Sequence, residues 1–102
     1  MQNEALSVLS SAMKAGKLVS GGDRVLDALR EGTVCLVVLS EDASENTKKR
    51  FHDQCAYRNV ALVEAGTRES LAKAVGKDLR SVAAIKDEGF RNLFLRKLNL
   101  GE

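Results

Sequence analysis

The side chains most often used in catalysis or metal binding are few in this chain, and their spacing suits no familiar reaction. The one histidine, His52 in "RFHDQCAY", has no Ser, Cys or Asp at a spacing that would complete a catalytic triad. Cys35 and Cys55 together with His52 match no recognised zinc pattern. Glu41 and Asp42 are adjacent, so their carboxylates diverge, and Asp42 suits a helix cap better than an acid pair. We therefore expect a protein that is not an enzyme and holds neither a metal nor a cofactor.

The stretch "LVSGGDRVLDALREG", residues 18–32, places two glycines at the start of an amphipathic helix. Its "SGGDRV" matches neither GxxxxGK[ST] nor GxGxxG, so neither a phosphate loop nor a dinucleotide site is expected. Asp23 in the first helical turn complements the helix dipole and would repel a phosphate. Gly21 and Gly22 therefore either form a turn or let the backbone approach a partner closely.

Hydrophobic periodicity predicts how these residues are positioned. Five segments have helical spacing or helix caps and four have the apolar, β-branched composition of strands. The central strand, "TVCLVVLS", is continuously apolar and is expected to be buried on both faces. Asp42 or Ser44 should cap the helix that follows it, with Glu45 completing a box from Asp42. The expected order is helix 3–16, edge strand 17–20, helix 22–32, strand 33–40, a helix through 47–55, strand 59–65, helix 67–76, strand 81–86 and helix 87–100.

Strands that alternate with helices of this length predict one α/β domain over residues 1–102. We expect a three-layer α-β-α sandwich with a mostly parallel four-stranded sheet. In such sheets ligands bind at loops along one edge, where strand ends meet helix N-termini. Three segments compete for that position, namely residues 21–27, 40–46 and 76–81.

Composition narrows the class of partner. The net charge is +2, from 16 basic and 14 acidic residues, so any nucleic acid must be bound by a local face rather than by a generally basic surface. Cys35 and Cys55 each lie in an apolar pattern, which favours buried thiols in a reducing cytoplasm over a disulfide. No segment has the pattern of a signal peptide or the roughly 20 apolar residues of a membrane span. We expect a cytoplasmic protein without a membrane or small-molecule partner.

The succession "GGDRVLDALREGTVCLVVLSEDASENTKK", "RESLAKAVGKDLRSVAAI" and "DEGF" resembles the kink-turn-binding ribosomal protein superfamily. Within it, "SEDASENTKK", "AVGK" and "DEGF" are similar to the small bacterial branch of the YlxQ type. The resemblance covers about residues 6–98. It implies a three-layer α-β-α sandwich that binds RNA without catalysis. In this family the start of the second helix enters the widened groove of a kinked RNA and reads tandem sheared G·A pairs.

The resemblance also implies which residues meet the RNA. The backbone amides of Gly21 and Gly22 approach it, and Asp23 and Arg24, which stand where the family has Asn and Glu, still supply one acceptor and one donor to the bases. Asp27 stands where the family has lysine and cannot donate to a phosphate. Four basic residues meet phosphates, and an apolar loop tip packs on an extruded nucleotide. The implied RNA-binding residues are Lys17, Gly21, Gly22, Asp23, Arg24, Asp27, Glu41, Lys48, Lys77, Leu79 and Arg80.

Two functions of different classes remain open at this point. The first is a monomeric protein that recognises kink-turn-like RNA, for example in ribosomal RNA. The second is a protein-interaction module on the same fold with weak or no RNA binding, which the departures at Asp23, Arg24 and Asp27 and the modest net charge favour. Several phosphate contacts would make affinity fall steeply with salt, so the salt dependence of binding separates the two.

Overall fold

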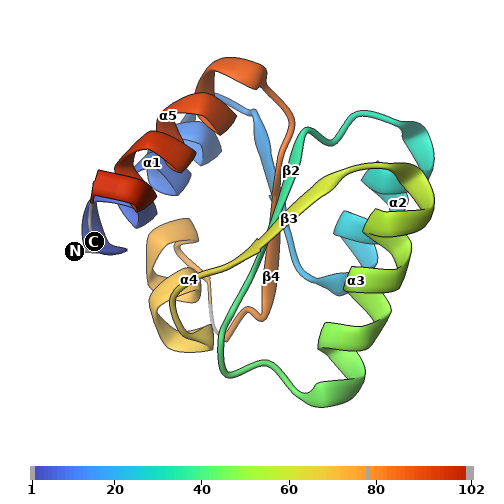
Figure 1. Cartoon of the computed structure of the whole chain (residues 1–102). Helices are drawn as coiled ribbons and strands as arrows, with labels where there is room; N and C mark the ends of the chain where they lie inside the picture. Colours follow the sequence, from blue (N-terminus) through green and yellow to red (C-terminus); the bar gives the residue numbers. More distant parts are fainter. Residues whose placement is uncertain (1, 78, 101–102) are drawn as a thin grey trace.

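The computed structural model describes residues 2–77 and 79–100, and in these residues five helices alternate with four strands (Figure 1). The order of elements agrees with the order expected from periodicity. No helix in residues 2–77 and 79–100 is both long and apolar enough to cross a membrane. The elements are α1 (Gln2–Lys14), β1 (Leu18–Ser20), α2 (Gly22–Glu31), β2 (Leu36–Leu39), α3 (Glu45–Arg58), β3 (Ala61–Glu64), α4 (Arg68–Val75), β4 (Val82–Ile85) and α5 (Glu88–Leu100).

The four strands form one mixed sheet in the order β1-β4-β2-β3. Of its three pairings, β2 with β3 is parallel, whereas β4 is antiparallel to both β1 and β2. The expectation of a mostly parallel sheet is therefore wrong. The reason lies in the β3-α4-β4 connection. After α4 the chain returns to the edge at which β3 ended, so β4 starts there and runs back between β1 and β2.

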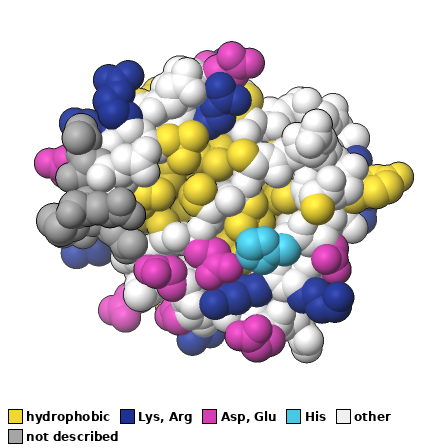
Figure 2. Space-filling view, in the orientation of Figure 1, with side chains coloured by type: hydrophobic (Ala, Val, Ile, Leu, Met, Phe, Trp, Pro, Cys, Tyr) yellow, Lys and Arg dark blue, Asp and Glu magenta, His cyan; other side chains and the backbone are white. Residues whose placement is uncertain are grey.

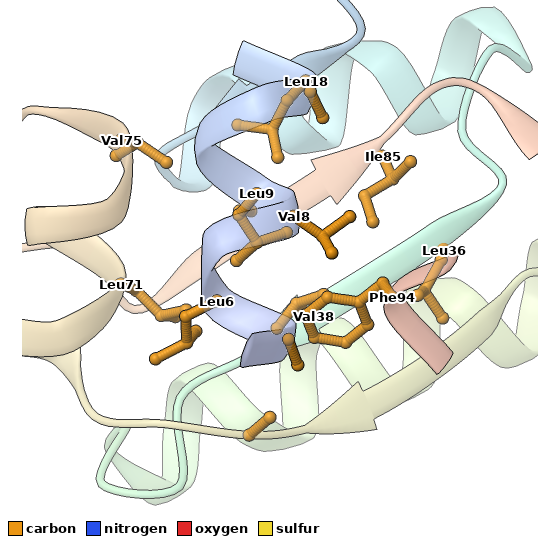
Figure 3. Close-up of a cluster of buried hydrophobic side chains, with 14 residues drawn as sticks. Leu6, Val8, Leu9, Leu18, Leu36, Val38, Leu71, Val75, Ile85 and Phe94 are labelled. Carbon is orange, nitrogen blue, oxygen red and sulfur yellow. The ribbon is translucent and has the colours of Figure 1, made fainter. Parts of the chain in front are cut away.

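Helices cover both faces of the sheet, which confirms the α-β-α layering (Figure 1). β2 is buried along its whole length, as its continuous apolar run predicts. Its alternate side chains point to opposite faces, so Val38 packs with α1, α4 and α5 while Val37 packs with α2 and α3. In the first of these two cores, Phe94 of α5 lies against Val38 and the side chains of α1 (Figure 3).

Helix caps set the boundaries of α3 and α4. Ser44 is the N-cap of α3 and its hydroxyl oxygen accepts a hydrogen bond from the backbone N–H of Thr47. The alternative cap, Asp42, does not serve α3, so the expected box with Glu45 is wrong. The Asp42 carboxylate instead accepts a hydrogen bond from the backbone N–H of Arg68, the first residue of α4. A cap pattern in the sequence does not reveal this because the bonded residues are remote in the chain.

Candidate functional site

The strand ends meet at one edge of the sheet, where β1, β2 and β3 finish and β4 begins. The N–H of Gly21 donates to the carbonyl of Val82 over 3.0 Å, and the N–H of Ser40 donates to the carbonyl of Ser81 over 2.8 Å. On the other side of β2, the N–H of Glu41 donates to the carbonyl of Gly66 over 2.8 Å. Each of the three segments proposed from the sequence, 21–27, 40–46 and 76–81, therefore contributes to this edge.

A cavity of about 240 Å³ opens at this edge between the start of α2, the first turns of α3 and the segment before β4. Phe51 and Val82 line its buried part, since their exposed fractions are 2% and 1%. Leu79 is the exposed apolar residue of the lining, and 60% of its surface is accessible. The remaining lining residues are Gly21, Gly22, Thr47, Arg50, Arg80 and Ser81.

The two glycines at the start of α2 have different roles. Gly21 is the N-cap residue and has φ 92° and ψ 145°, a backbone conformation essentially confined to glycine. Gly22 is helical, and a Cβ at that position would lie 3.9 Å from the ring of Phe51, an ordinary contact. Gly21 therefore makes the turn, while Gly22 keeps the surface beside Phe51 open.

Within the described part of the chain, no side chain caps the N-terminus of α2. The first N–H groups of an α-helix have no partner inside the helix, so those of α2 remain to bind an acceptor. Asp23 and Arg24 in this first turn are exposed. Asp27, one turn further, is also exposed and lies 3.3 Å from the guanidinium of Arg30. This pairing offsets part of the negative charge that Asp27 adds to the surface of α2.

Basic side chains reach the cavity from two elements. Arg80 donates from Nη1 to the carbonyl of Leu79, and its buried Nε has no hydrogen-bond partner in residues 2–77 and 79–100. The same Nε lies 3.7 Å from the position that a Cβ on Gly21 would take. Arg50 of α3 lines the cavity and is exposed. Together these side chains place positive charge beside the start of α2.

Arg50, Thr47 and Phe51 are site residues that sequence reasoning missed. Arg50 belongs to the run Lys48–Lys49–Arg50, which has the composition of a solvated helix face. The spacing of the three cavity residues, i, i+3 and i+4, places them on one side of α3. That spacing is the signal in the sequence that could have placed Arg50 beside Thr47 and Phe51.

Lys48 lies on a different side of α3 and faces the end of β3. Its Nζ is 3.4 Å from Oε1 of Glu64, whose Oε2 is 2.9 Å from Nε2 of His52. The hydrogen bond from His52 and the nearby Lys48 ammonium hold the pKa of Glu64 below its usual value. Figure 2 shows His52, the one histidine, among acidic and basic side chains on the surface. His52 is exposed.

Two further basic residues named from the sequence do not line the cavity. Lys17 precedes β1, and its carbonyl accepts a hydrogen bond from the N–H of Lys86 at the opposite end of the strand from Gly21. With a strand rise of about 3.3 Å per residue, this is roughly 13 Å from Gly21. Lys77 is exposed just after α4, and its N–H donates to the carbonyl of Ala72. The neighbouring Asp78 lies outside the described residues.

The loop after β2 is held to the start of α4 by Asp42. One carboxylate oxygen accepts from the N–H of Arg68 over 2.8 Å, and the other lies 3.7 Å from the Arg68 guanidinium. The backbone hydrogen bond is the main reason that the pKa of Asp42 is lowered from its ordinary value. Asp42 therefore acts as a structural anion that fixes this part of the sheet edge.

The cysteines are both free thiols and lie in different surroundings. Cys55 is buried in the core between α3 and the sheet, and burial raises its pKa to about 11. Cys35 is half-buried just before β2, less buried than the sequence pattern predicts. Among residues 2–77 and 79–100, no group of three or more His, Cys, Asp or Glu side chains is placed to hold a metal ion.

Residues 3–94 match the sequence pattern of the ribosomal protein L7Ae/L30e/S12e/Gadd45 family. The chain belongs to this family. Its relative from Bacillus subtilis, the RNA-binding protein YlxQ, is 38% identical over 96 residues, which cover 94% of this chain and 96% of the relative. The resemblance to the YlxQ-type branch of the superfamily is thereby confirmed.

Two solved structures show the same fold for this family member. A Bacillus halodurans protein of unknown function superimposes with a TM-score of 0.82 at 40% identity, covering 88% of this chain and 92% of that one. The Giardia lamblia 15.5kD RNA binding protein superimposes with a TM-score of 0.75 at 20% identity, covering 92% of this chain and 81% of that one. At 20% identity, the second superposition shows only that the two proteins share a fold.

Proposed function

We propose that this protein binds structured RNA of the kink-turn type without catalysis and that it associates with the ribosome. The observation that carries the proposal is the cavity beside the start of α2, framed by Gly21 and Gly22, Arg80 and the exposed Leu79. Family membership and the Bacillus subtilis relative, which is named an RNA-binding protein, support the same function.

The start of α2 would form the centre of the interface. No side chain of the described residues caps its backbone N–H groups, which suit a phosphate oxygen or a base acceptor. Asp23 would accept from, and Arg24 would donate to, the exposed edges of sheared G·A pairs. Since Asp27 already pairs with Arg30, its carboxylate repels the RNA backbone less than an isolated charge would.

The cavity would receive an unstacked base extruded from the kink. Unpaired RNA bases are bound by side chains that replace their stacking partners. Leu79 would cover one face of such a base, and Phe51 would provide the apolar end of the cavity. With 60% of its surface exposed, Leu79 is accessible to a base at this cavity.

Arg80, Arg50 and Lys77 would contact phosphates around this base. A guanidinium binds a phosphate with two parallel hydrogen bonds, and Nε of Arg80 has no acceptor in the described residues. Lys17 and Lys48 lie outside this group, so we expect them to contribute less to affinity. Glu41 follows β2 at the same edge and would contact the RNA through its backbone.

The experiment compares two RNAs with the purified protein. A kink-turn and a matched duplex lacking the tandem G·A pairs are titrated with protein at several salt concentrations. Specific binding predicts tighter binding to the kink-turn and an affinity that falls steeply with salt. Equal affinity for the two RNAs would contradict kink-turn recognition, and a flat salt response would favour a protein-interaction module.

Ribosome association needs a separate measurement. Cell lysates are fractionated on sucrose gradients, and the protein is followed with an antibody before and after ribonuclease treatment. We expect it to sediment with ribosomal particles and to leave them after the treatment. Sedimentation as a free protein at low salt would contradict this part of the proposal and leave RNA binding to be judged from the titration.

A further inference from the structure

A second cavity, of about 630 Å³, lies at the opposite edge of the sheet, where α2 and α3 end and β2 and β3 begin. Leu29 and Val34 are buried and line it together with the half-buried Val60. Arg30, Arg58 and Tyr57 complete the site. With a rise of 1.5 Å per residue, α2 separates this cavity from the proposed RNA site by about 15 Å.

Tyr57 is placed where it contributes to neither core. Its exposed fraction is 83%, and the guanidinium carbon of Arg58 lies 5.6 Å from the centre of its ring. This distance is within the range of a cation-π contact, which orders the two side chains relative to each other. Tyrosine and arginine are enriched in protein interfaces and among the residues that contribute most of the binding energy.

Arg58 also carries a hydrogen-bond donor that the fold does not satisfy. Its Nε is buried and has no hydrogen-bond partner in residues 2–77 and 79–100. The carbonyls at the end of α3 are capped by the backbone N–H groups of Asn59 and Val60. A buried donor without an acceptor is costly, so an acceptor supplied by a ligand would be bound favourably.

We propose that this cavity binds an acidic segment of a partner protein, with an aliphatic side chain against Leu29 and Val60 and carboxylates on Arg58 and Arg30. Guanidinium groups bind carboxylates with paired hydrogen bonds, and the apolar lining gives the segment an anchor. The aliphatic lining offers nothing to a phosphate backbone, whereas it suits the apolar side chain of a peptide. The proposal is independent of the proposed RNA function.

The probe is a blocked synthetic pentapeptide, Glu-Asp-Leu-Asp-Glu, titrated into the ¹⁵N-labelled full chain. We expect saturable shifts of the backbone amides of Gly32, Val34 and Arg58, with those at Gly21 and Gly22 unchanged. Two control peptides replace either the leucine by serine or the four acidic residues by lysine. Both should bind at least about ten-fold more weakly, since one lacks the apolar anchor and the other the carboxylates.

Variants test the residues themselves. Arg58→Ala and Tyr57→Ala should each weaken peptide binding about ten-fold or more, whereas Lys49→Ala, an exposed change on the same helix, should leave it unaltered. Arg58→Lys keeps the charge and the aliphatic part of the side chain. It replaces Arg58→Ala as the test if the alanine variant alters the amide spectrum as a whole. The proposal is overturned if the acidic peptide shifts no amide around the cavity, or if the lysine peptide binds equally well. It is also overturned if a uridine heptamer shifts these amides more strongly than the peptide.

Discussion

The carboxylate of Asp42 accepts a hydrogen bond from the backbone N–H of Arg68, 26 positions further along the chain, over 2.8 Å. This bond joins the loop after β2 to the first turn of α4 at the edge of the sheet that carries the proposed RNA site. The neighbouring bond from the N–H of Glu41 to the carbonyl of Gly66 ties the same two segments together. The edge is therefore rigidly connected on the side of β3 as well as on the side of β4.

Acid should weaken the fold through Asp42. Its pKa in the folded protein is below its ordinary value of 3.8, so the unfolded chain binds the proton more tightly. The stabilising contribution is therefore complete above the unfolded pKa and is lost as the pH falls through the folded pKa. Asp42→Asn should be less stable than the parent near neutral pH, and the difference should shrink in strong acid. Urea unfolding at about pH 7 and about pH 2.5 measures this.

The control for Asp42 is Glu31→Gln, a change at an exposed carboxylate at the end of α2. It should follow the parent protein at both pH values. If Asp42→Asn lost the same free energy of unfolding at both pH values, a neutral packing role rather than the charge of Asp42 would explain its effect.

The two glycines at the start of α2 should respond differently to alanine. Gly21→Ala forces a Cβ onto a residue with φ 92° and should lower the free energy of unfolding by about 1–3 kcal/mol. Gly22→Ala adds a Cβ with ordinary contacts inside a helix and should be neutral or stabilising by up to about 1 kcal/mol. Chemical denaturation of both variants compares them directly. Equal destabilisation would show that the backbone conformation of Gly21 is not what sets it apart.

Gly22→Ala also separates folding from RNA binding. Because the added methyl group narrows the cavity beside Phe51, we expect weaker kink-turn binding in a protein that is fully folded. Unchanged affinity would mean that the RNA does not approach this part of the backbone.

Arg50 and Arg80 should contribute to RNA affinity, although they come from different elements. Arg50→Ala and Arg80→Ala should each lower kink-turn affinity about ten-fold and reduce the salt dependence by roughly one phosphate contact. Lys49→Ala is the matched control, because Lys49 is 79% exposed and pairs with Asp53 on the same helix. A loss as large for Lys49 as for Arg50 would indicate a diffuse basic surface in place of a site at the cavity.

Leu79 should act through the extruded base. Leu79→Ser should leave the free energy of unfolding within about 0.5 kcal/mol, since the side chain is 60% exposed, yet lower kink-turn affinity roughly five-fold. An RNA with an abasic site at the extruded position should bind the parent and the variant equally. If the variant lost affinity for the abasic RNA too, Leu79 would contact another part of the RNA.

Several features of the fold followed from local sequence. The caps at Ser44 and Gly32, the full burial of β2 and the alternation of helices and strands all depend on residues a few positions apart. The convergence of three segments on one sheet edge was also predicted, although the segment 76–81 reaches that edge only because β4 runs antiparallel to β2. The antiparallel direction of β4 was not predicted, because a helix followed by a strand has the same local sequence pattern in either orientation.

The sequence by itself determined the order of the elements, the central position of β2 and the family, because hydrophobic period, caps and motifs are properties of neighbouring residues. Only the tertiary structure decided that Asp42 binds α4 and that Arg50 lines the cavity while Lys48 pairs with Glu64. Each of these relations depends on how distant segments pack against one another. Side chains one or two positions apart on α3 point towards different elements of the fold. The residue types alone do not show which element each side chain faces.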